Sequence, residues 1–176
     1  MLVVLFSMFL YAKQTPNVVL VNQEGKPFQI YDLRGNYLFL SFIYTRCPLP
    51  QMCPLTITLN KKLAREWPKR FKKKPLKLLM LTLDPEYDTP KVMKEFAVKR
   101  KLDLNQFILA TSNTQVLNDF GTFFEVVKRV EGQGMIGHNL VSVLLSPKLE
   151  IIKTFQENQW SPSSVFQAVE SLPSTK

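Results

Sequence analysis

The sequence predicts an α/β domain in which helices flank a central mixed β-sheet that is preceded by an N-terminal β-hairpin. Short apolar runs typical of buried strands alternate with stretches in which apolar residues recur at helical spacing. These helical stretches stand between successive strands, where they can act as crossover connections and allow parallel pairing. The chain has 176 residues, 45% of them hydrophobic and 21% charged, which suits one domain with one core and argues against disorder.

The predicted sheet begins with a hairpin and continues with two central strands. A turn that contains Gly25 separates the hairpin strands, which we expect at Val18–Val21 and Phe28–Ile30. The runs Tyr37–Tyr44 and Leu76–Leu83 are almost continuously apolar, as in strands that are covered on both faces. These two runs therefore predict the middle of the sheet.

Each central strand is followed by signals for a helix. Apolar residues recur every fourth position from Pro54 to Trp67, which predicts a helix that ends at Pro68. Thr89 followed by Pro90 is an N-cap signal, and the helix that it opens should run to about Arg100.

The C-terminal half continues the alternation of strands and helices. We expect a strand at Phe107–Ala110, a helix at Gln115–Glu125, a glycine-rich loop at Glu131–Gly137, two hairpin strands at Leu140–Leu145 and Glu150–Phe155, and a helix from Ser161-Pro162 to about Leu172. With the first half, this order predicts a mixed sheet with helices on both faces.

The first residues differ from the rest of the chain. Residues 1–12 (MLVVLFSMFLYA) are apolar and uncharged, and a polar break follows them. We expect residues 1–14 to be a signal-peptide remnant or a membrane anchor and residues 15–176 to be a single domain. A terminal strand or buried segment is the alternative. Export to the periplasm or another extracytoplasmic space would place the cysteines in an oxidising compartment.

Both cysteines of the chain fall in one proline-rich turn between the first central strand and its helix. The turn reads Cys47-Pro48-Leu49-Pro50-Gln51-Met52-Cys53-Pro54. Active groups tend to lie at the carboxyl ends of strands in such sheets, and a helix N-terminus lowers the pKa of a nearby thiol. Cys47 and Cys53 can therefore form a redox dithiol or a two-sulfur metal site, although buried and inert cysteines are also possible.

The chain resembles the Sco/SenC family of thioredoxin-like proteins over nearly all of residues 16–173. The matching stretches are Asn22–Lys26, Asp32–Gly35, Phe42–Pro48, Cys53–Thr56, Asp84–Pro90 and His138. The resemblance implies a thioredoxin-like fold and an exported, usually membrane-tethered protein that helps to assemble the copper centre of cytochrome c oxidase. It also implies that a copper ion, Cu(I) or Cu(II), binds to Cys47, Cys53 and His138. Family members usually have three residues between the cysteines, and this chain has five.

Several side chains near these positions are candidates for supporting roles. Asp84 and Asp88 can support the metal ligands as hydrogen-bonding partners, and Asp88 can instead cap the following helix or form an Asx turn. Met52 and Met135 can offer thioether contacts, although methionine is more often core filler. His138 can also be a polar surface residue. We expect the three glycines of its loop, at positions 132, 134 and 137, to let the loop move.

Two functional hypotheses follow. The first is a metallochaperone that delivers copper to the copper-receiving subunit of cytochrome c oxidase or to another thiol protein. The second is a thiol–disulfide oxidoreductase that reduces partner cysteines without storing metal, because the inserted residues change the ligand loop and still leave both thiols available. A peroxidase that uses Thr45 and Arg46 beside Cys47 is a weaker third possibility. Hydrolase and phosphate-loop motifs do not stand out.

Positive charge is concentrated in one segment, Lys61–Lys77. This segment holds nine of the 23 basic residues and one of the 14 acidic residues, so the rest of the chain holds 14 basic and 13 acidic residues. It can be a solvated helix face, a contact for an anionic membrane surface, or a guide for an acidic partner. Few aromatic residues are interleaved with these charges, which argues against nucleic-acid binding.

Overall fold

The computed structural model describes residues 13–131 and 135–173, and its centre is a seven-stranded sheet. The strand order is β2-β1-β5-β4-β3-β8-β9. The strands are β1 (Val19–Asn22), β2 (Pro27–Gln29), β3 (Tyr37–Ile43), β4 (Leu76–Thr82), β5 (Phe107–Thr111), β8 (Val141–Leu145) and β9 (Ile151–Gln156). β3, β4 and β5 pair in parallel and the other pairs are antiparallel, which confirms the predicted mixed sheet.

The middle of the sheet is formed by the two apolar runs that predicted it. All seven residues of β3 are buried, and the strand is central in the sheet, with β4 on one side and β8 on the other. The N-terminal hairpin of β1 and β2 is joined to the same sheet, since β1 also pairs with β5. The hairpin therefore extends the sheet, and a short 3-10 helix, η1 (Ile30–Leu33), connects it to β3.

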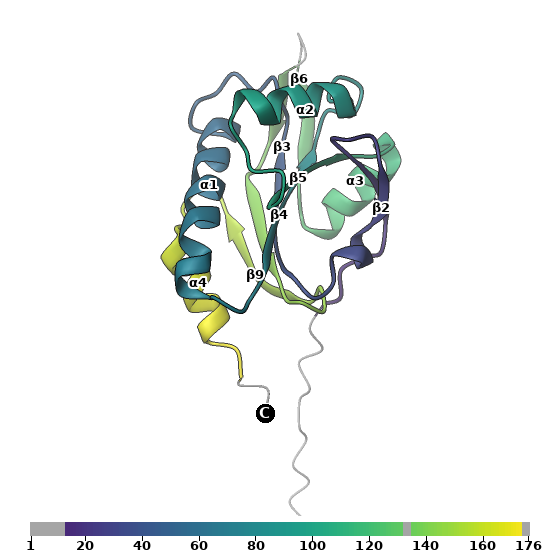
Figure 1. The fold of residues 1–176 in the computed structure, drawn as a ribbon. Coiled ribbons are helices and arrows are strands. Elements are labelled where there is room, and N and C mark those ends of the chain that lie inside the picture. Colours follow the sequence, from purple (N-terminus) through teal and green to yellow (C-terminus); the bar gives the residue numbers. More distant parts are fainter. Residues whose placement is uncertain (1–12, 132–134, 174–176) are drawn as a thin grey trace, which may run out of the picture.

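Helices cover both faces of the sheet, as predicted. They are α1 (Cys53–Arg70), α2 (Pro90–Lys99), α3 (Thr114–Phe123) and α4 (Pro162–Glu170). α1 and α4 pack against each other on one face, α3 lies on the opposite face, and α2 packs against β5 (Figure 1). Thr89 is the N-cap of α2, as expected, and its side chain accepts a hydrogen bond from the backbone N–H of Val92. α3 is shorter than predicted because Glu125 has a φ of 62°, which is incompatible with a helix.

The prediction that α1 ends at Pro68 is wrong, because the helix continues to Arg70 with this proline inside it. A proline removes one helical hydrogen bond and crowds the preceding turn. Aromatic packing offsets this cost: the Trp67 ring lies 4.7 Å from the ring of Phe71 and 6.1 Å from the ring of Phe166. The last turn of α1 is therefore held against α4.

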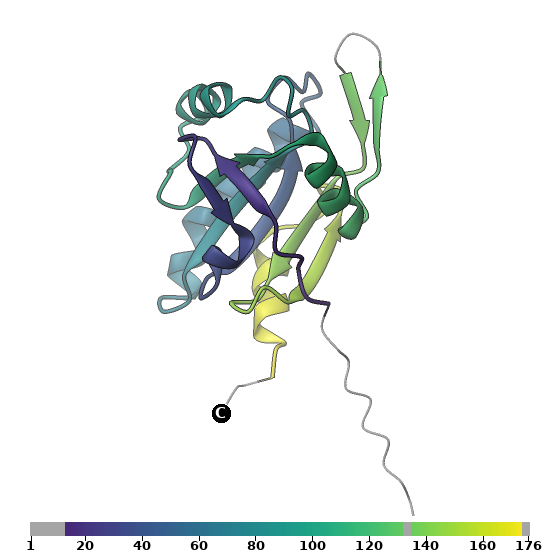
Figure 2. The same cartoon turned by 90° about the vertical axis from the view of Figure 1, so that its right-hand side faces the viewer.

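The prediction of a loop at Glu131–Gly137 is also wrong, because the described residues of this segment belong to two strands. β6 (Lys128–Glu131) and β7 (Met135–His138) form a separate two-stranded antiparallel sheet, which projects from the main sheet in Figure 2. β6 is largely exposed, so it lacks the apolar pattern that marks a buried strand. A Cβ at Gly137 would lie 2.5 Å from Oε1 of Glu131, so this glycine allows a close approach. The glycines at positions 132 and 134 lie outside the described residues.

The expected signal-peptide remnant or anchor falls largely on residues 1–12, which lie outside the described residues. The next residues join the main domain: Gln14 forms a bridge with Glu150, and the N–H of Thr15 donates to the carbonyl of Leu149 at 3.1 Å. Between positions 13 and 173, leaving out 132–134, no helix is long and apolar enough to cross a membrane.

Candidate metal and thiol site

The two cysteines lie where β3 passes into α1. Three residues separate Cys47 from the end of β3, and Cys53 is the first residue of α1. The turn between them is stabilised by backbone hydrogen bonds, including one from the N–H of Met52 to the carbonyl of Leu49. Cys53 is buried and Cys47 is partly exposed, and both thiols are free. The site therefore contains one solvent-accessible sulfur, that of Cys47, and one buried sulfur, that of Cys53.

The surroundings of the two thiols shift their pKa values in opposite directions. A hydrogen bond from the Cys53 thiol lowers the pKa of Cys47 to about 5, with help from the backbone N–H groups of Cys53 and Leu49. The interaction with Cys47 and burial raise the pKa of Cys53. At neutral pH the pair therefore carries one negative charge, on Cys47. The backbone N–H of Cys53, the first residue of α1, is the part of the helix N-terminus that lowers the pKa of this accessible thiol.

Tyr44 belongs to the site, although the sequence indicated only a buried strand residue at this position. Burial and a hydrogen bond to Cys47 raise the pKa of Tyr44 to about 12, so its hydroxyl stays protonated. The ring also meets His138 edge-on, with the centroids 6.1 Å apart. Tyr44 thus contacts both the accessible thiolate and the imidazole.

His138 ends β7 and faces the cysteines from the other side. Its Nδ1 lies 2.8 Å from the backbone carbonyl of Asn139, so Nδ1 carries the proton and donates to this oxygen. The remaining nitrogen, Nε2, lies 4.0 Å from Sγ of Cys53. Burial lowers the pKa of His138, which favours the neutral imidazole with a free lone pair on Nε2.

The structure places His138 beside Cys53, and the Cys53 thiol interacts with Cys47. Sulfur and nitrogen ligands lie about 2.3 and 2.0 Å from a bound metal, so two such donors to one ion are at most about 4.3 Å apart. The separation of Cys53 and His138 satisfies this limit. In the part of the chain that the structure describes, however, no three His, Cys, Asp or Glu side chains are arranged to hold one ion as they stand. Cys53 and His138 are therefore a close donor pair, and Cys47 joins them through the Cys53 thiol.

Asp88 supports the cysteine loop and does not contact the histidine. Its buried carboxylate accepts hydrogen bonds from the backbone N–H of Thr45 at 3.0 Å, from the Thr45 hydroxyl, and from the Thr82 hydroxyl at 2.6 Å. Burial raises the pKa of Asp88. The helix cap considered for this residue is supplied by Thr89. Asp88 thus fixes the backbone two residues before Cys47.

Asp84 also acts on the segment before Cys47. Its carboxylate accepts a hydrogen bond of 2.7 Å from Nε of Arg46, whose guanidinium lies over the ring of Tyr87 at 4.5 Å. The partner of the histidine is the carbonyl of Asn139, so neither carboxylate orients His138. Thr45 and Arg46, which were considered for peroxide chemistry, are instead bonded to these two carboxylates.

Asn158 is a second residue that the sequence did not single out. It follows β9, and its Nδ2 donates to the carbonyls of Gln51 and Met52 at 3.0 and 3.1 Å. Its Oδ1 accepts from the hydroxyl of Thr56. A polar residue after a strand carries no pattern that would reveal this long-range contact. Met52 is the N-cap residue of α1, and Met135 is exposed at the far end of β7.

Comparison with known proteins identifies the family and agrees with this fold. The SCO1/SenC family model matches residues 12–174. A SCO1 protein homolog from Bacillus subtilis is 27% identical over 146 residues, which cover 80% of this chain and 72% of that protein.

Solved structures show the same thioredoxin-like fold. Arabidopsis thaliana ScoI with copper bound superposes with a TM-score of 0.77 at 19% identity, covering 91% of this chain and 100% of that one. BsSco, described with a disulfide switch as a member of the Sco family of cytochrome c oxidase assembly proteins, gives a TM-score of 0.76 at 21% identity, with 94% and 96% covered.

Proposed function

Because this chain belongs to the SCO1/SenC family, we propose that it binds one copper ion as cargo through Cys47, Cys53 and His138. The recipient is the copper-receiving subunit of cytochrome c oxidase or another thiol protein. Two thiols and an imidazole form a donor set that suits Cu(I), and with a further ligand it can also serve Cu(II).

The proposal depends above all on the pairing of Cys53 with His138. Nε2 of the histidine lies 4.0 Å from Sγ of Cys53, and its other nitrogen is already used by the carbonyl of Asn139. The imidazole is therefore held in the tautomer and orientation that a ligand needs. Cys47 supplies the thiolate that a soft metal prefers, because its pKa is lowered to about 5.

Binding through all three donors requires a small rearrangement. Cys47 is partly exposed and lies in a turn, whereas Cys53 is buried at the start of α1. We therefore assign the movement to the turn that carries Cys47. Five residues separate the two cysteines, and a turn of this length allows Cys47 to move relative to Cys53.

The known relatives support copper as the cargo. Copper is bound in the solved structure of Arabidopsis thaliana ScoI, and BsSco is described as a member of a family of cytochrome c oxidase assembly proteins. We further propose an extracytoplasmic location, with the chain held at a membrane through its N-terminal part. The support for this location is the uncharged, apolar sequence of residues 1–12.

Anaerobic titration of the reduced full chain with Cu(I), in competition with a colorimetric Cu(I) chelator, tests the assignment. We expect one copper per chain. Cys47→Ser and Cys53→Ser should abolish competition with the chelator, and His138→Ala should weaken binding about 10- to 100-fold. Met135→Leu is the matched control, because Met135 is exposed and lies three residues from His138. Unchanged stoichiometric binding in the cysteine variants would refute the copper assignment.

A second candidate function, thiol–disulfide exchange, is favoured by the opposite pKa shifts of the two thiols. The Cys47 thiolate attacks one sulfur of a partner disulfide and forms a mixed disulfide, while the other partner sulfur leaves as a thiolate and takes up a proton. Cys53 then loses its proton and attacks Sγ of Cys47. This step forms the Cys47–Cys53 disulfide and releases the second partner thiol.

His138→Ala separates the two functions. The exchange chemistry needs only the thiols, so this variant should still reduce a model peptide disulfide at close to the wild-type rate while its copper affinity falls. Release of the peptide thiols can be followed with a chromogenic thiol reagent. A reduced protein that leaves the peptide disulfide intact would exclude the oxidoreductase candidate.

A further inference from the structure

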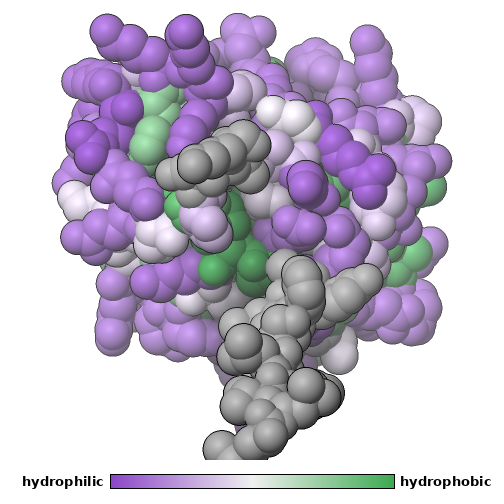
Figure 3. All heavy atoms as spheres, turned by 90° about the horizontal axis from the view of Figure 1, so that it is seen from below, coloured by the Kyte–Doolittle hydropathy of each residue, from purple (hydrophilic) through white to green (hydrophobic). Residues whose placement is uncertain are grey.

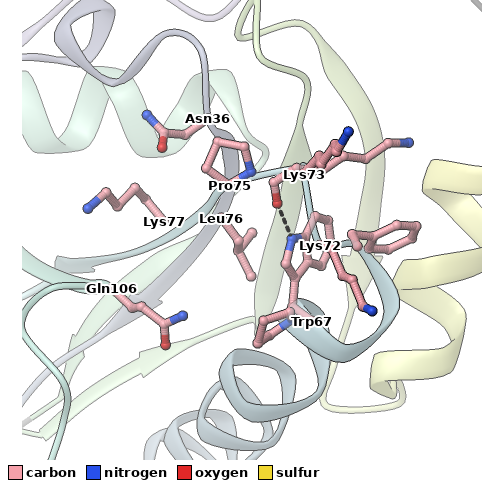
Figure 4. Close-up of a pocket in the computed structure, with 11 residues that line it drawn as sticks. Asn36, Trp67, Lys72, Lys73, Pro75, Leu76, Lys77 and Gln106 are labelled. Carbon is pink, nitrogen blue, oxygen red and sulfur yellow. Dashed lines mark hydrogen bonds between the residues drawn. The ribbon is translucent and has the colours of Figure 1, made fainter.

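A hollow of about 420 Å³ lies at the end of the molecule where α1 passes into β4. Its wall includes the lysine end, which we define as Lys72, Lys73, Lys74 and Lys77, and two amide side chains, those of Asn36 and Gln106. The indole of Trp67 also lines it and donates a hydrogen bond to the carbonyl of Lys74 (Figure 4). Four cations and two amides thus surround one concave surface.

The charges of the lysine end are not neutralised by neighbouring carboxylates. Among residues 13–131 and 135–173, none of these four lysines has a carboxylate within ion-pair distance. Nζ of Lys74 lies over the rings of Phe71 and Tyr37, at 5.1 and 5.7 Å. Nζ of Lys77 donates to the carbonyl of Asn105. These contacts leave all four positive charges in place, and Lys72, Lys73 and Lys74 are exposed.

The described chain begins at this same end of the molecule. The N–H of Thr15 bonds to Leu149 in the turn between β8 and β9. The N–H of Gly35 reaches Pro147 in that turn, and the N–H of Tyr37 bonds to Pro75 beside the lysines. These backbone contacts link the first described residues to the lysine end. Lys148, also in the β8–β9 turn, is exposed and adds a further positive charge.

The surface at this end is mainly hydrophilic around a smaller apolar area, as the view from below shows (Figure 3). Acidic groups are also present. The carboxylate of Asp32 accepts a hydrogen bond from Gln29, and Glu170 pairs with Arg70. These two carboxylates are therefore engaged within the protein, and the four lysines have no ion-pair partner among the described residues.

The thiols lie at the opposite end of the same helix. α1 has 18 residues, with Cys53 first and Arg70 last. At 1.5 Å per residue the helix is about 27 Å long. In Figure 1, α1 runs from the end of the molecule that carries the cysteine loop to the end where the described chain begins. A surface that contacts the lysines therefore leaves Cys47 and His138 uncovered.

We propose that the lysine end docks onto an anionic lipid bilayer and directs the thiol site away from it. The occupant is indicated by the neighbouring sequence, because the residues before Lys13 are apolar and uncharged and join the domain at this end. An apolar segment beside a cluster of basic residues is the two-signal arrangement that gives stable membrane binding. This inference does not depend on copper binding.

Co-sedimentation of the full chain with vesicles tests the proposal. We expect tighter binding to vesicles of equal parts phosphatidylglycerol and phosphatidylcholine than to phosphatidylcholine alone. The variant Lys72→Gln/Lys73→Gln/Lys74→Gln/Lys77→Gln should bind the anionic vesicles at least about tenfold more weakly. The control Lys26→Gln/Lys91→Gln/Lys99→Gln/Lys101→Gln removes the same charge elsewhere and should bind them more tightly than the lysine-end variant. Four Lys→Arg changes at the lysine end should retain binding.

Salt dependence and thiol labelling give two further tests of the docking proposal. Raising the salt from about 0.1 to about 1 M, which shortens the Debye length from about 10 to about 3 Å, should remove the preference for anionic vesicles. Equal binding by the wild type and the lysine-end variant would overturn the proposal, as would an equal loss in the control variant. A membrane-impermeant maleimide should react with Cys47 equally fast on bound and free protein. A slower reaction on vesicles would overturn the proposed orientation.

Discussion

The two ends of α1 differ in how their functional groups are held. At the thiol end, the functional groups are partly or fully buried. The segment that carries them is fixed by a hydrogen bond that Asp88 accepts from the N–H of Thr45 and by one that Asn158 donates to the carbonyl of Gln51. At the lysine end, three of the four lysines are exposed, and none of the four has an ion-pair partner among the described residues. Metal or thiol chemistry requires atoms at defined distances, whereas a charged surface acts through its summed field. The first end should therefore be sensitive to single substitutions, and the second should tolerate them.

The largest effect is expected from Asp88→Ala. This change removes the carboxylate that accepts from the Thr45 N–H and from the Thr45 and Thr82 hydroxyls. It leaves two partly buried donors of Thr45 and the buried hydroxyl of Thr82 without this partner. We expect a loss of at least about 3 kcal/mol in the free energy of unfolding, measured by urea denaturation. Asp119→Ala, on the exposed surface of α3, is the control and should change stability by less than about 0.5 kcal/mol.

The pH dependence of this effect has a defined sign. Burial raises the folded-state pKa of Asp88 above its ordinary value of 3.8. Its contribution to stability is therefore greatest below pH 3.8 and falls as the pH rises through the higher folded-state pKa. The difference between wild type and Asp88→Ala should grow as the pH is lowered from 7 towards 4. A difference that shrinks over this range would contradict the shift.

An intermediate effect is expected on the reactivity of Cys47. The Cys53 thiol is the main cause of its lowered pKa, so Cys53→Ala should return the pKa towards the ordinary value of 9.0. The alkylation rate of Cys47 at pH 6, followed by mass spectrometry, should fall at least about tenfold because the thiolate is the nucleophile. In the wild type the rate should rise around pH 5 and be level by pH 7. Tyr44→Phe should have a smaller effect, and a wild-type rate for Cys53→Ala would refute the proposed hydrogen bond.

The smallest effect is expected at the lysine end. Lys72→Ala and Lys73→Ala remove exposed side chains that have no ion-pair partner in the described part of the chain. Each should change the free energy of unfolding by less than about 0.5 kcal/mol, measured under the same urea conditions as Asp88→Ala. A loss comparable to that of Asp88→Ala would remove the contrast between the two ends.

Most of the fold could be predicted because its buried elements have a strong local signal. β3 and β4 are continuous apolar runs, and Thr89-Pro90 opens α2 as expected. The β6–β7 hairpin could not be found in this way, since β6 is mainly exposed and has no apolar face. The passage of α1 through Pro68 depends on aromatic packing between distant residues. A local rule that ends helices at proline cannot include this contact.

The site was predictable to the extent that its chemistry is visible in residue types. Both cysteines and His138 stand out in the sequence, and the structure places His138 beside Cys53, whose thiol interacts with Cys47. The roles of the supporting residues depend on tertiary contacts. Asp88 contacts the cysteine loop, 43 positions away in sequence, and Asn158 contacts it across more than 100 positions. The sequence predicts Tyr44 as a buried strand residue. Its role in the site depends on the hydrogen bond between its hydroxyl and Cys47, which the sequence does not show.

The length of α1 also limits how far the thiol site can lie from a surface that contacts the lysine end. If the lysine end contacts a bilayer, this stiff helix holds Cys53 up to about 27 Å above it, so a membrane-embedded recipient must raise its own metal ligands away from the lipid. Because the helix is rigid, the height cannot adjust to a recipient whose ligands lie close to the lipid. The protein would then select its partners by the elevation of their metal site as well as by their ligand chemistry.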